Sequence, residues 1–266
     1  MKIGFIGTGN MGGALARAAA KGGHTLLLAN RTPAKAEALA KELGGTVCPN
    51  AVAAEKAELL FLGVKPQGLP GLAGELAPVL QARKGNAPVV VSMATAVTLR
   101  ELDAMLGGGL PLIRIMPNTP AAVGAGTILY AAQNVTDAQL NAFRAVLAQA
   151  GLLLPLPEEK IDAASAISGC GPAFCFQFAD ALALGGVRAG LSYPDACRLA
   201  AQTMLGAAEM LLQGGEAPDV LKMRVCSPAG TTIEGVLALE QGGFSYTVQN
   251  AVTAAYRRTV EMTKKG

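Results

Sequence analysis

Three glycines in the pattern Gly7-x-Gly9-x-x-Gly12 directly follow the short apolar run Lys2–Ile6 and open an alanine-rich segment with a helical pattern. In a strand–turn–helix unit, the first glycine allows the tight turn and the second lets the backbone approach a pyrophosphate. The third lets the helix pack closely against the sheet, with its N-terminus facing the phosphates. A glycine-rich turn without a ligand is the alternative. The position directly after a first strand favours a dinucleotide-binding domain.

The first half of the chain continues to alternate short apolar runs with helical patterns, which is typical of a parallel sheet. We predict strands over Lys2–Ile6, Thr25–Ala29, Thr46–Cys48, Leu59–Val64, Val89–Ser92, Leu112–Met116, Thr127–Tyr130 and Leu152–Leu156. We predict helices over Gly12–Lys21, Pro33–Leu43, Leu69–Leu80, Leu99–Met105 and Asp137–Gln149. The predicted fold class is therefore α/β, with an N-terminal Rossmann domain built on a doubly wound, mainly parallel sheet.

After Pro155-Leu156-Pro157 only helical patterns remain. We predict helices over residues 158–188, 193–213, 218–226, 232–241 and 245–264. Ser192 and Ser245 are the expected N-caps of two of them. We therefore expect a Rossmann domain over residues 1–156, followed by an all-α domain over residues 157–266.

Composition limits the partners of the chain. Hydrophobic residues make up 51% of the sequence and charged residues 15%, so we expect an oligomer with a large apolar interface. The net charge is only +3 and no long Lys/Arg cluster is present, which argues against nucleic acid. The long uncharged stretches contain Pro, Gly, Asn or Gln, so we expect no membrane span.

Cysteine and histidine usage limits the compartment and the chemistry. The five cysteines form no CxxC pair and the N-terminal apolar run is too short for a signal peptide, so we expect reduced thiols in a cytoplasmic protein. The single histidine, His24, argues against Ser-His-Asp catalysis and against a histidine-based metal site, and we predict no metal. Hydride transfer from a bound cofactor fits this scarcity of acid–base groups.

The end of the second predicted strand indicates which dinucleotide binds. A site that prefers NAD places Asp or Glu there, whereas this chain has Ala29-Asn30-Arg31-Thr32. A guanidinium beside two neutral hydrogen-bonding side chains suits a 2′-phosphate. The alternative is that Arg31 is an exposed charge at a helix start. We predict NADPH as the cofactor, with NADH as a weaker alternative.

Other candidate residues follow neighbouring strands, at the edge where ligands bind in open α/β sheets. Lys65, before a proline, is either a cofactor contact or a lysine that snorkels from a strand end. Asn118 is either a cofactor contact or a turn former. The segment Ser92-Met93-Ala94-Thr95 ends another strand at the same edge.

A second polar constellation separates two of the C-terminal helices. Ser227-Pro228-Ala229-Gly230-Thr231-Thr232 offers hydroxyls and free backbone N–H groups at a helix start, which suits a carboxylate. Thr231 and Glu234 have the spacing of a capping box, so we expect Thr231 to be the N-cap. By spacing alone, an ordinary helix–loop–helix link remains the alternative.

Five segments of the chain resemble the pyrroline-5-carboxylate reductase family, and together they span nearly the whole chain in the family's order. They are Gly4-Phe5-Ile6-Gly7-Thr8-Gly9-Asn10-Met11, Val64-Lys65-Pro66, Met116-Pro117-Asn118-Thr119-Pro120, Ser168-Gly169-Cys170-Gly171-Pro172-Ala173-Phe174 and the loop signature within Pro218–Glu240. The resemblance implies a Rossmann domain followed by a helical domain that interlocks with a second copy in a homodimer, often assembled further. It implies reduction of the cyclic imine 1-pyrroline-5-carboxylate to L-proline.

The resemblance also implies the roles of individual residues. Thr232 would be the catalytic residue that faces the imine nitrogen. The expected substrate-binding residues are Glu158, Val225, Ser227, Gly230, Thr231 and Thr232. The expected cofactor-binding residues are Ile6, Gly7, Thr8, Gly9, Asn10, Met11, Gly12, Asn30, Arg31, Asn50, Gly63, Val64, Lys65, Pro66, Met93, Ala94, Thr95 and Asn118.

Two positions depart from the family's pattern: Arg224 stands where Asn is frequent, and Cys170 where Ser is common. The rival enzymes are a β-hydroxyacid dehydrogenase and another imine reductase. The first uses a lysine on the long helix after the boundary, but no lysine lies between Lys160 and Lys222. A non-catalytic NADPH-binding sensor is the rival from another class, and the second polar loop argues against it.

Overall fold

The computed structural model describes residues 1–83 and 85–263. Its backbone divides into two compact units. The first comprises residues 1–170 together with the chain from residue 255, and the second comprises residues 171–254.

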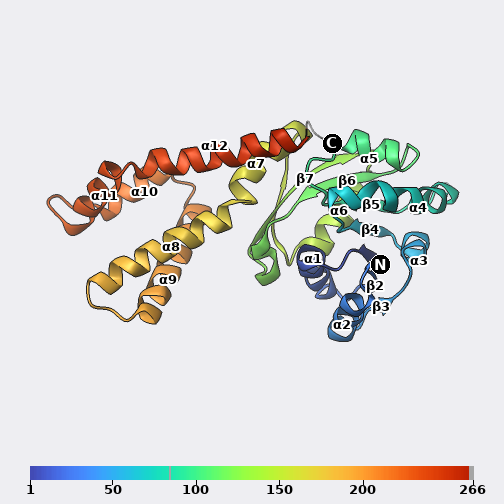
Figure 1. Ribbon diagram of the computed structural model, residues 1–266, viewed down its shortest axis with the longest axis horizontal. Coiled ribbons are helices and arrows are strands. Elements are labelled where there is room, and N and C mark those ends of the chain that lie inside the picture. Colours follow the sequence, from blue (N-terminus) through green and yellow to red (C-terminus); the bar gives the residue numbers. More distant parts are fainter. Residues whose placement is uncertain (84, 264–266) are drawn as a thin grey trace. The chain divides into compact units, whose positions relative to one another are not determined.

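The first unit is built on one eight-stranded sheet in the order β3-β2-β1-β4-β5-β6-β7-β8 (Figure 1). Its strands are β1 (Lys2–Ile6), β2 (Thr25–Ala29), β3 (Thr46–Val47), β4 (Leu59–Leu62), β5 (Val89–Ser92), β6 (Leu112–Met116), β7 (Gly126–Gln133) and β8 (Gly151–Pro155). Strands β1 to β6 pair in parallel, β7 is antiparallel to β6, and β8 is parallel to β7. This order is that of a Rossmann fold with a two-strand extension, which confirms the predicted mainly parallel sheet.

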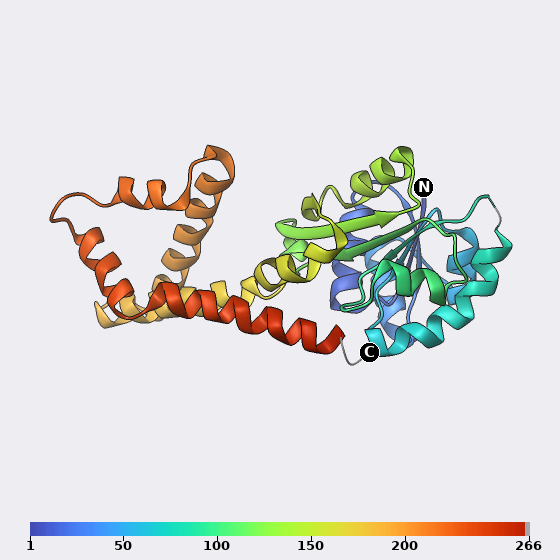
Figure 2. The same cartoon turned by 90° about the horizontal axis from the view of Figure 1, so that it is seen from above.

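Helices cover both faces of the sheet (Figure 2). Their bounds are α1 (Asn10–Ala20), α2 (Pro33–Leu43), α3 (Asn50–Lys56), α4 (Leu69–Ala82), α5 (Leu99–Met105), α6 (Asp137–Leu147) and α7 (Glu158–Ser168), with 3-10 turns η1 (Pro66–Gly68) and η2 (Thr119–Val123). Helices α1, α2 and α6 share one buried apolar cluster with the sheet, whereas α3, α4, α5 and α7 share the other. The central strands read as continuous apolar runs because both of their faces are buried.

The second unit contains only helices among the residues described. They are α8 (Gly171–Arg188), α9 (Tyr193–Gly214), α10 (Pro218–Val225), α11 (Thr231–Gln241) and α12 (Phe244–Thr263), whose last residues belong to the first unit. Helices α8 and α9 pack against each other. The Tyr193 hydroxyl donates a hydrogen bond of 2.7 Å to Asp180, and this bond is the main reason that the pKa of Tyr193 rises to about 12.

Three sequence-based expectations about the helices need correction. The stretch 158–188 is interrupted, because the N–H groups of Gly169 and Cys170 both turn back to the Ser165 carbonyl and Pro172 lies in the first turn of the next helix. Helix α3 was not expected. Ser245 is not an N-cap, because α12 begins at Phe244 and the Ser245 hydroxyl donates to Glu240 instead.

The other expected N-cap, Ser192, is confirmed. The Ser192 side chain accepts a hydrogen bond from the Asp195 N–H, as an N-cap does. The predicted end of the last helix at residue 264 lies outside the described residues.

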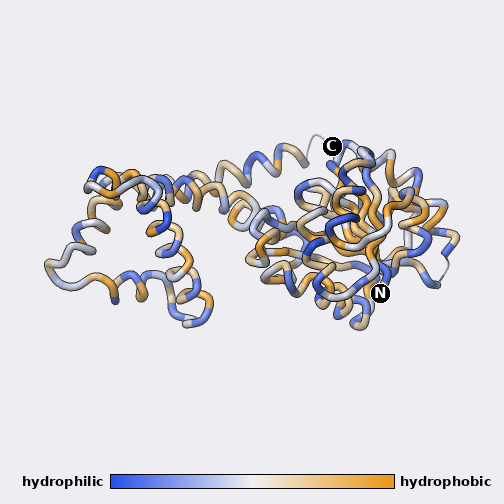
Figure 3. Tube along the Cα trace, turned by 90° about the horizontal axis from the view of Figure 1, so that it is seen from below, coloured by the Kyte–Doolittle hydropathy of each residue, from blue (hydrophilic) through white to orange (hydrophobic). Residues whose placement is uncertain are grey.

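Large apolar side chains are exposed along the helices of the second unit. Those at least half exposed are Phe176, Leu184, Leu199, Leu205, Met210, Leu212, Met223, Val225 and Tyr246. Figure 3 shows hydrophobic residues interspersed with hydrophilic ones along these helices. By length and composition alone, one described stretch, Glu158–Arg188, is apolar enough to cross a membrane. That stretch includes the interruption at Gly169 and Cys170. A folded chain that exposes this much apolar surface needs a partner surface to cover it.

Candidate functional site

The glycine turn after β1 is held by backbone contacts that exclude side chains. The Gly7 N–H donates to the Ala29 carbonyl at 2.8 Å, and the Gly63 N–H donates to the Ile6 carbonyl at 2.7 Å. A Cβ on Gly7 would lie 2.5 Å from the Gly63 oxygen, and a Cβ on Gly63 would lie 2.4 Å from the Gly7 oxygen. Gly7 also has a φ of +96°, which favours glycine. Two strand ends therefore touch through their main chains.

The other two glycines of the motif differ in their surroundings. A Cβ on Gly12 would lie 2.0 Å from the Gly7 oxygen, so this position fixes how closely α1 approaches the turn. A Cβ on Gly9 would meet nothing within 4 Å, so the space above Gly9 is open. Gly9 precedes the first turn of α1, whose N–H groups have no acceptor within the helix. Close packing on one side and open space on the other are the geometry of a phosphate-binding turn.

Asn30 joins this turn to the loop after β2. Its Oδ1 accepts a hydrogen bond of 2.9 Å from the Thr8 N–H, and its Nδ2 donates to the Thr32 carbonyl at 3.0 Å. The Thr8 hydroxyl is buried and has no hydrogen-bond partner within the described structure. The Asn30 amide is thus used to shape the site.

A cavity of about 780 Å³ opens beside the glycine turn. Nine of the expected cofactor residues line it: Ile6, Gly7, Gly9, Asn30, Arg31, Asn50, Gly63, Val64 and Lys65. It is also lined by Thr32, Lys35, Gln67, Gly68, Gly71, Leu72 and Glu75, of which only Thr32 was considered from the sequence. The cavity therefore extends from the glycine turn to the loop after β2 and to the first turns of α4.

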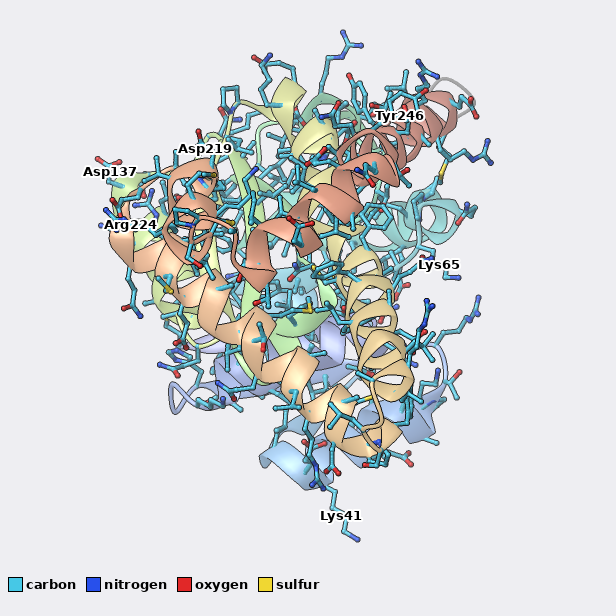
Figure 4. The ribbon with its side chains drawn as sticks, turned by 90° about the vertical axis from the view of Figure 1, so that its left-hand side faces the viewer. Lys41, Lys65, Asp137, Asp219, Arg224 and Tyr246 are labelled. Carbon is cyan, nitrogen blue, oxygen red and sulfur yellow. The ribbon has the colours of Figure 1, made fainter. Side chains whose placement is uncertain are left out.

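The charged groups of the cavity are mostly basic. Arg31, Lys35 and Lys65 line it, and Glu75 is its one acidic lining residue. Lys65 lines the cavity, is exposed and projects away from the ribbon in Figure 4. Three cations around an open phosphate-binding turn fit a dinucleotide that carries an extra phosphate.

The remaining expected cofactor residues do not line this cavity. They are Thr8, Asn10, Met11, Gly12, Pro66, Met93, Ala94, Thr95 and Asn118. Ala94 and Asn118 are buried. The Asn118 Nδ2 donates to the Ser168 carbonyl and its Oδ1 accepts from the Thr127 N–H, both at 2.8 Å. Since both ends of this amide are satisfied within the first unit, Asn118 holds the chain after β6 in place.

Glu158 begins α7 and takes part in a buried ionic cluster. Its Oε1 accepts from the Leu99 N–H at 2.7 Å and lies 3.4 Å from Nη1 of Arg114. Arg114, on β6, is only 2% exposed and also donates to Asp162 of α7. The cluster ties α7 to the sheet and to the start of α5.

The second polar loop forms a tight turn before α11. The Gly230 N–H donates to the Ser227 carbonyl at 3.0 Å, across Pro228 and Ala229. Ala229 has a φ of +54°, the left-handed conformation that the third position of a type II turn requires. A Cβ on Gly230 would lie 2.2 Å from the Ser227 Oγ, so a side chain at this position would displace the Ser227 hydroxyl.

Thr231 is not the N-cap of α11, contrary to the sequence-based expectation. The helix begins at Thr231, Gly230 occupies the cap position, and no side chain bonds to the first turn. The tight turn at Ser227–Gly230 shifts the start of the helix by one residue. Among the residues described, neither the Thr231 nor the Thr232 hydroxyl has a partner. Both hydroxyls therefore lie at the N-terminus of α11 with their hydrogen-bonding capacity unused.

The two residues that depart from the family's pattern, Arg224 and Cys170, lie in different parts of the structure. Arg224, in the last turn of α10, forms a two-pronged ion pair with Glu216. Val225, next to it, is 63% exposed. Cys170 lies at the interruption between α7 and α8 and is a free thiol. The ion pair of Arg224 thus connects the last turn of α10 with the chain just before that helix.

A parallel sheet with this strand order, a phosphate-binding glycine turn and a basic cavity defines a dinucleotide-binding protein of the oxidoreductase type. Residues 2–96 match the family model described as "NADP oxidoreductase coenzyme F420-dependent", and residues 158–262 match "Pyrroline-5-carboxylate reductase dimerisation". A pyrroline-5-carboxylate reductase of Synechocystis is 39% identical over 274 residues, covering 100% of this chain and 99% of the relative. The chain belongs to the pyrroline-5-carboxylate reductase family.

Solved structures agree with this assignment. A pyrroline-5-carboxylate reductase from Coxiella burnetii has a TM-score of 0.89 at 31% identity and covers 97% of both chains. The Plasmodium falciparum pyrroline carboxylate reductase, solved with NADP bound, has a TM-score of 0.86 at 30% identity and covers 99% of both chains. The dimerisation match begins at residue 158, whereas the contact-based division falls after residue 170, so α7 packs on the sheet although it belongs to the dimerisation segment.

Sequence reasoning missed the α4 side of the cavity and Lys35. Lys35 lies in the first turn of α2, and its position close after Arg31 in the sequence was the available signal. Gly68, Gly71, Leu72 and Glu75 share one helical face, but only the folded arrangement shows which face of α4 meets the cavity.

Proposed function

We propose that this protein reduces 1-pyrroline-5-carboxylate to L-proline with NADPH as the hydride donor. The observation that carries the proposal is the full-length relationship to pyrroline-5-carboxylate reductases, combined with a glycine turn and basic side chains that suit NADPH. The cofactor supplies the hydride, which adds to the imine carbon while the nitrogen takes up a proton. An iminium accepts hydride without a strong general acid, so the scarcity of histidine is no obstacle.

Cofactor binding is assigned to the first unit. The N–H groups around Gly7 and Gly9 and in the first turn of α1, Asn10–Gly12, suit the pyrophosphate, and Arg31 and Lys35 suit the 2′-phosphate. We place the nicotinamide along the carboxyl edge of the sheet. Pro66, Met93, Ala94 and Thr95 follow the strands there, although they do not line the cavity.

Substrate binding is assigned to the turn before α11. Ser227, Thr231 and the N–H groups after Gly230 suit the substrate carboxylate, because a helix N-terminus favours a negative charge. Thr232 is the proposed catalytic residue, whose hydroxyl hydrogen-bonds the imine nitrogen. Val225 is a proposed apolar contact. Glu158 remains a proposed substrate residue, although its carboxylate is already engaged with Leu99 and Arg114.

The proposed biological form is a homodimer, or a larger oligomer built from it, in the cytoplasm. The match to a dimerisation family over residues 158–262 and the exposed apolar side chains of the same segment support self-association. A second copy accounts for this apolar surface better than a membrane does, because relatives of the same length are metabolic reductases. All five cysteines are free thiols, as expected of a reducing compartment.

The test is a turnover assay on the full chain. NADPH oxidation, followed by the absorbance of the reduced nicotinamide, should depend on added pyrroline-5-carboxylate, and the proline formed should equal the NADPH consumed. A β-hydroxy acid with NADP and an unrelated cyclic imine without a carboxylate are the comparison substrates, because they report the two rival enzymes. Tight NADPH binding with no proline formed would refute the proposed reaction and favour the sensor alternative.

A further inference from the structure

Glu75 is an acid in a cavity that is otherwise basic or neutral. It lies on α4, is exposed, and accepts a hydrogen bond of 3.0 Å at Oε2 from Nδ2 of Asn50. Asn50 is the first residue of α3, and helices α3 and α4 pack together. A carboxylate accepts more hydrogen bonds than this one, so Glu75 retains unused acceptor sites at the cavity wall.

The ends of the cavity determine which part of a dinucleotide lies near Glu75. The glycine turn takes the pyrophosphate, and Arg31 with Lys35 takes the phosphate on the adenosine ribose, as in the proposed function. The lining on η1 and α4, to which no phosphate is assigned, is Gln67, Gly68, Gly71, Leu72 and Glu75. The base attached to that ribose is the part of the cofactor left to occupy this wall.

Two glycines leave open space in front of the same wall. A Cβ on Gly68 or Gly71 would meet nothing within 4 Å, so no side chain and no neighbouring atom fills the space in front of these residues. Leu72, one turn before Glu75 on the same face, adds an apolar surface. A ligand group with a planar, apolar face and one polar edge would fit the open space beside Leu72 and Glu75.

The polar end of the wall contains one acceptor-only group, the Glu75 carboxylate. Nδ2 of Asn50 gives one of its two hydrogens to Glu75, which leaves the Asn50 amide with one N–H and its carbonyl oxygen. A ligand edge that meets Glu75 must therefore present a donor. Adenine presents its 6-amino group, whereas a purine with a 6-oxo group presents an oxygen that a carboxylate repels.

We propose that Glu75 recognises the 6-amino group of the cofactor's adenine, with Asn50 held in place by the same carboxylate. This inference rests on the proposed use of NADPH but not on the identity of the imine substrate. It adds to the proposed phosphate-binding residues one residue that recognises the base.

The experiment compares two cofactors by direct binding, without the imine substrate. NADPH and its hypoxanthine analogue, in which a 6-oxo group replaces the amine, are titrated against the full chain and followed by nicotinamide fluorescence. The wild-type chain should bind NADPH more tightly by roughly 10-fold, the effect of one hydrogen bond to a charged group. In Glu75→Gln, the amide oxygen can keep the Asn50 bond while the amino group faces the 6-oxo purine, so the preference should shrink to about 1–3-fold.

Glu37→Gln is the matched control, because Glu37 is an exposed acid on the neighbouring α2 that does not line the cavity. Its preference for NADPH should equal that of the wild type. Equal weakening of both cofactors in Glu75→Gln would overturn the proposal and leave Glu75 as a support for Asn50 only. Equal affinity of the wild type for both cofactors would overturn it as well. A failure to reduce pyrroline-5-carboxylate leaves this result unaffected, whereas failure to bind NADPH at all refutes both proposals.

Discussion

At the scale of single residues, Arg31 is the best test of cofactor choice. Its guanidinium lines the cavity next to Asn30, whose own amide is occupied by Thr8 and Thr32. In Arg31→Asp we expect NADPH affinity to fall by about 100-fold and NADH affinity by less than about 3-fold, because a carboxylate repels the 2′-phosphate. Dissociation constants for the two cofactors measure this.

Lys41→Asp is the control for Arg31→Asp, because it makes the same change of charge on α2. Lys41 is exposed and projects away from the protein at a site that does not line the cavity (Figure 4). It should leave the ratio of the two affinities unchanged. If Arg31→Asp weakens both cofactors equally, Arg31 does not contact the 2′-phosphate.

Thr231 and Thr232 are adjacent hydroxyls for which we propose different roles. Thr232→Ala should lower turnover by about 10–100-fold with NADPH affinity unchanged, because one hydrogen bond to the nitrogen is lost as its charge changes. Thr231→Ala should raise the Michaelis constant for the imine by about 5-fold. It should leave the melting temperature unchanged, since Thr231 makes no capping bond. Steady-state kinetics on the two variants would show reversed roles if the effects are exchanged.

At the scale of secondary structure elements, the contact between the ends of β1 and β4 is set by two glycines. Gly63→Ala places a methyl group 2.4 Å from the Gly7 oxygen, so we expect a loss of about 1–3 kcal/mol in the free energy of unfolding. Gly74→Ala is the control, because Gly74 is an exposed position within α4 with open space around it. That change should instead stabilise the chain by about 0.5–1 kcal/mol. Urea denaturation distinguishes the two, and equal effects would contradict the contact.

The Arg114 cluster makes a second prediction at this scale. Arg114→Met leaves the half-buried Glu158 and Asp162 of α7 without their cation and should lower the free energy of unfolding by about 1–3 kcal/mol. Arg17→Met breaks the exposed pair with Glu42 and should lower it by less than about 1 kcal/mol. Similar losses in the two variants would show that the buried cluster does not hold α7.

The success of sequence reasoning depended on how each element is buried. Strands such as Leu59–Leu62 and Val89–Ser92 were recognised because sheets covered on both faces produce apolar runs. Helix α3 was missed because the two residues that it buries, Ala53 and Ala54, are small, so it lacks a stripe of large apolar side chains. The prediction that Thr231 is the N-cap was wrong because the turn with left-handed Ala229 determines where α11 begins. The glycine turn was placed correctly from the sequence. The contribution of α4 to the cavity lining was not predicted, because it depends on tertiary packing.

At the scale of the whole molecule, we expect the active form to be an oligomer. Phe176 on α8 is 69% exposed, and it lies within the dimerisation segment. Phe176→Glu should shift the molar mass toward the monomer and lower activity, because a charge in an apolar interface is strongly unfavourable. Val123, 80% exposed in the first unit, provides the control Val123→Glu, which should not change the mass. Light scattering over a dilution series measures both, and a fully active monomeric wild type would contradict the prediction.

The backbone contact between Gly7 and Gly63 has a consequence for inhibitor resistance. A compound that binds against this turn in place of the cofactor phosphates would rest on main-chain atoms. Resistance usually arises when a side chain changes, but any side chain at Gly7, Gly12 or Gly63 would collide with neighbouring backbone atoms. Escape at these positions would therefore damage the fold along with the inhibitor site. Resistant variants should instead arise where the cavity is lined by exposed side chains, such as Lys35, Gln67 and Glu75.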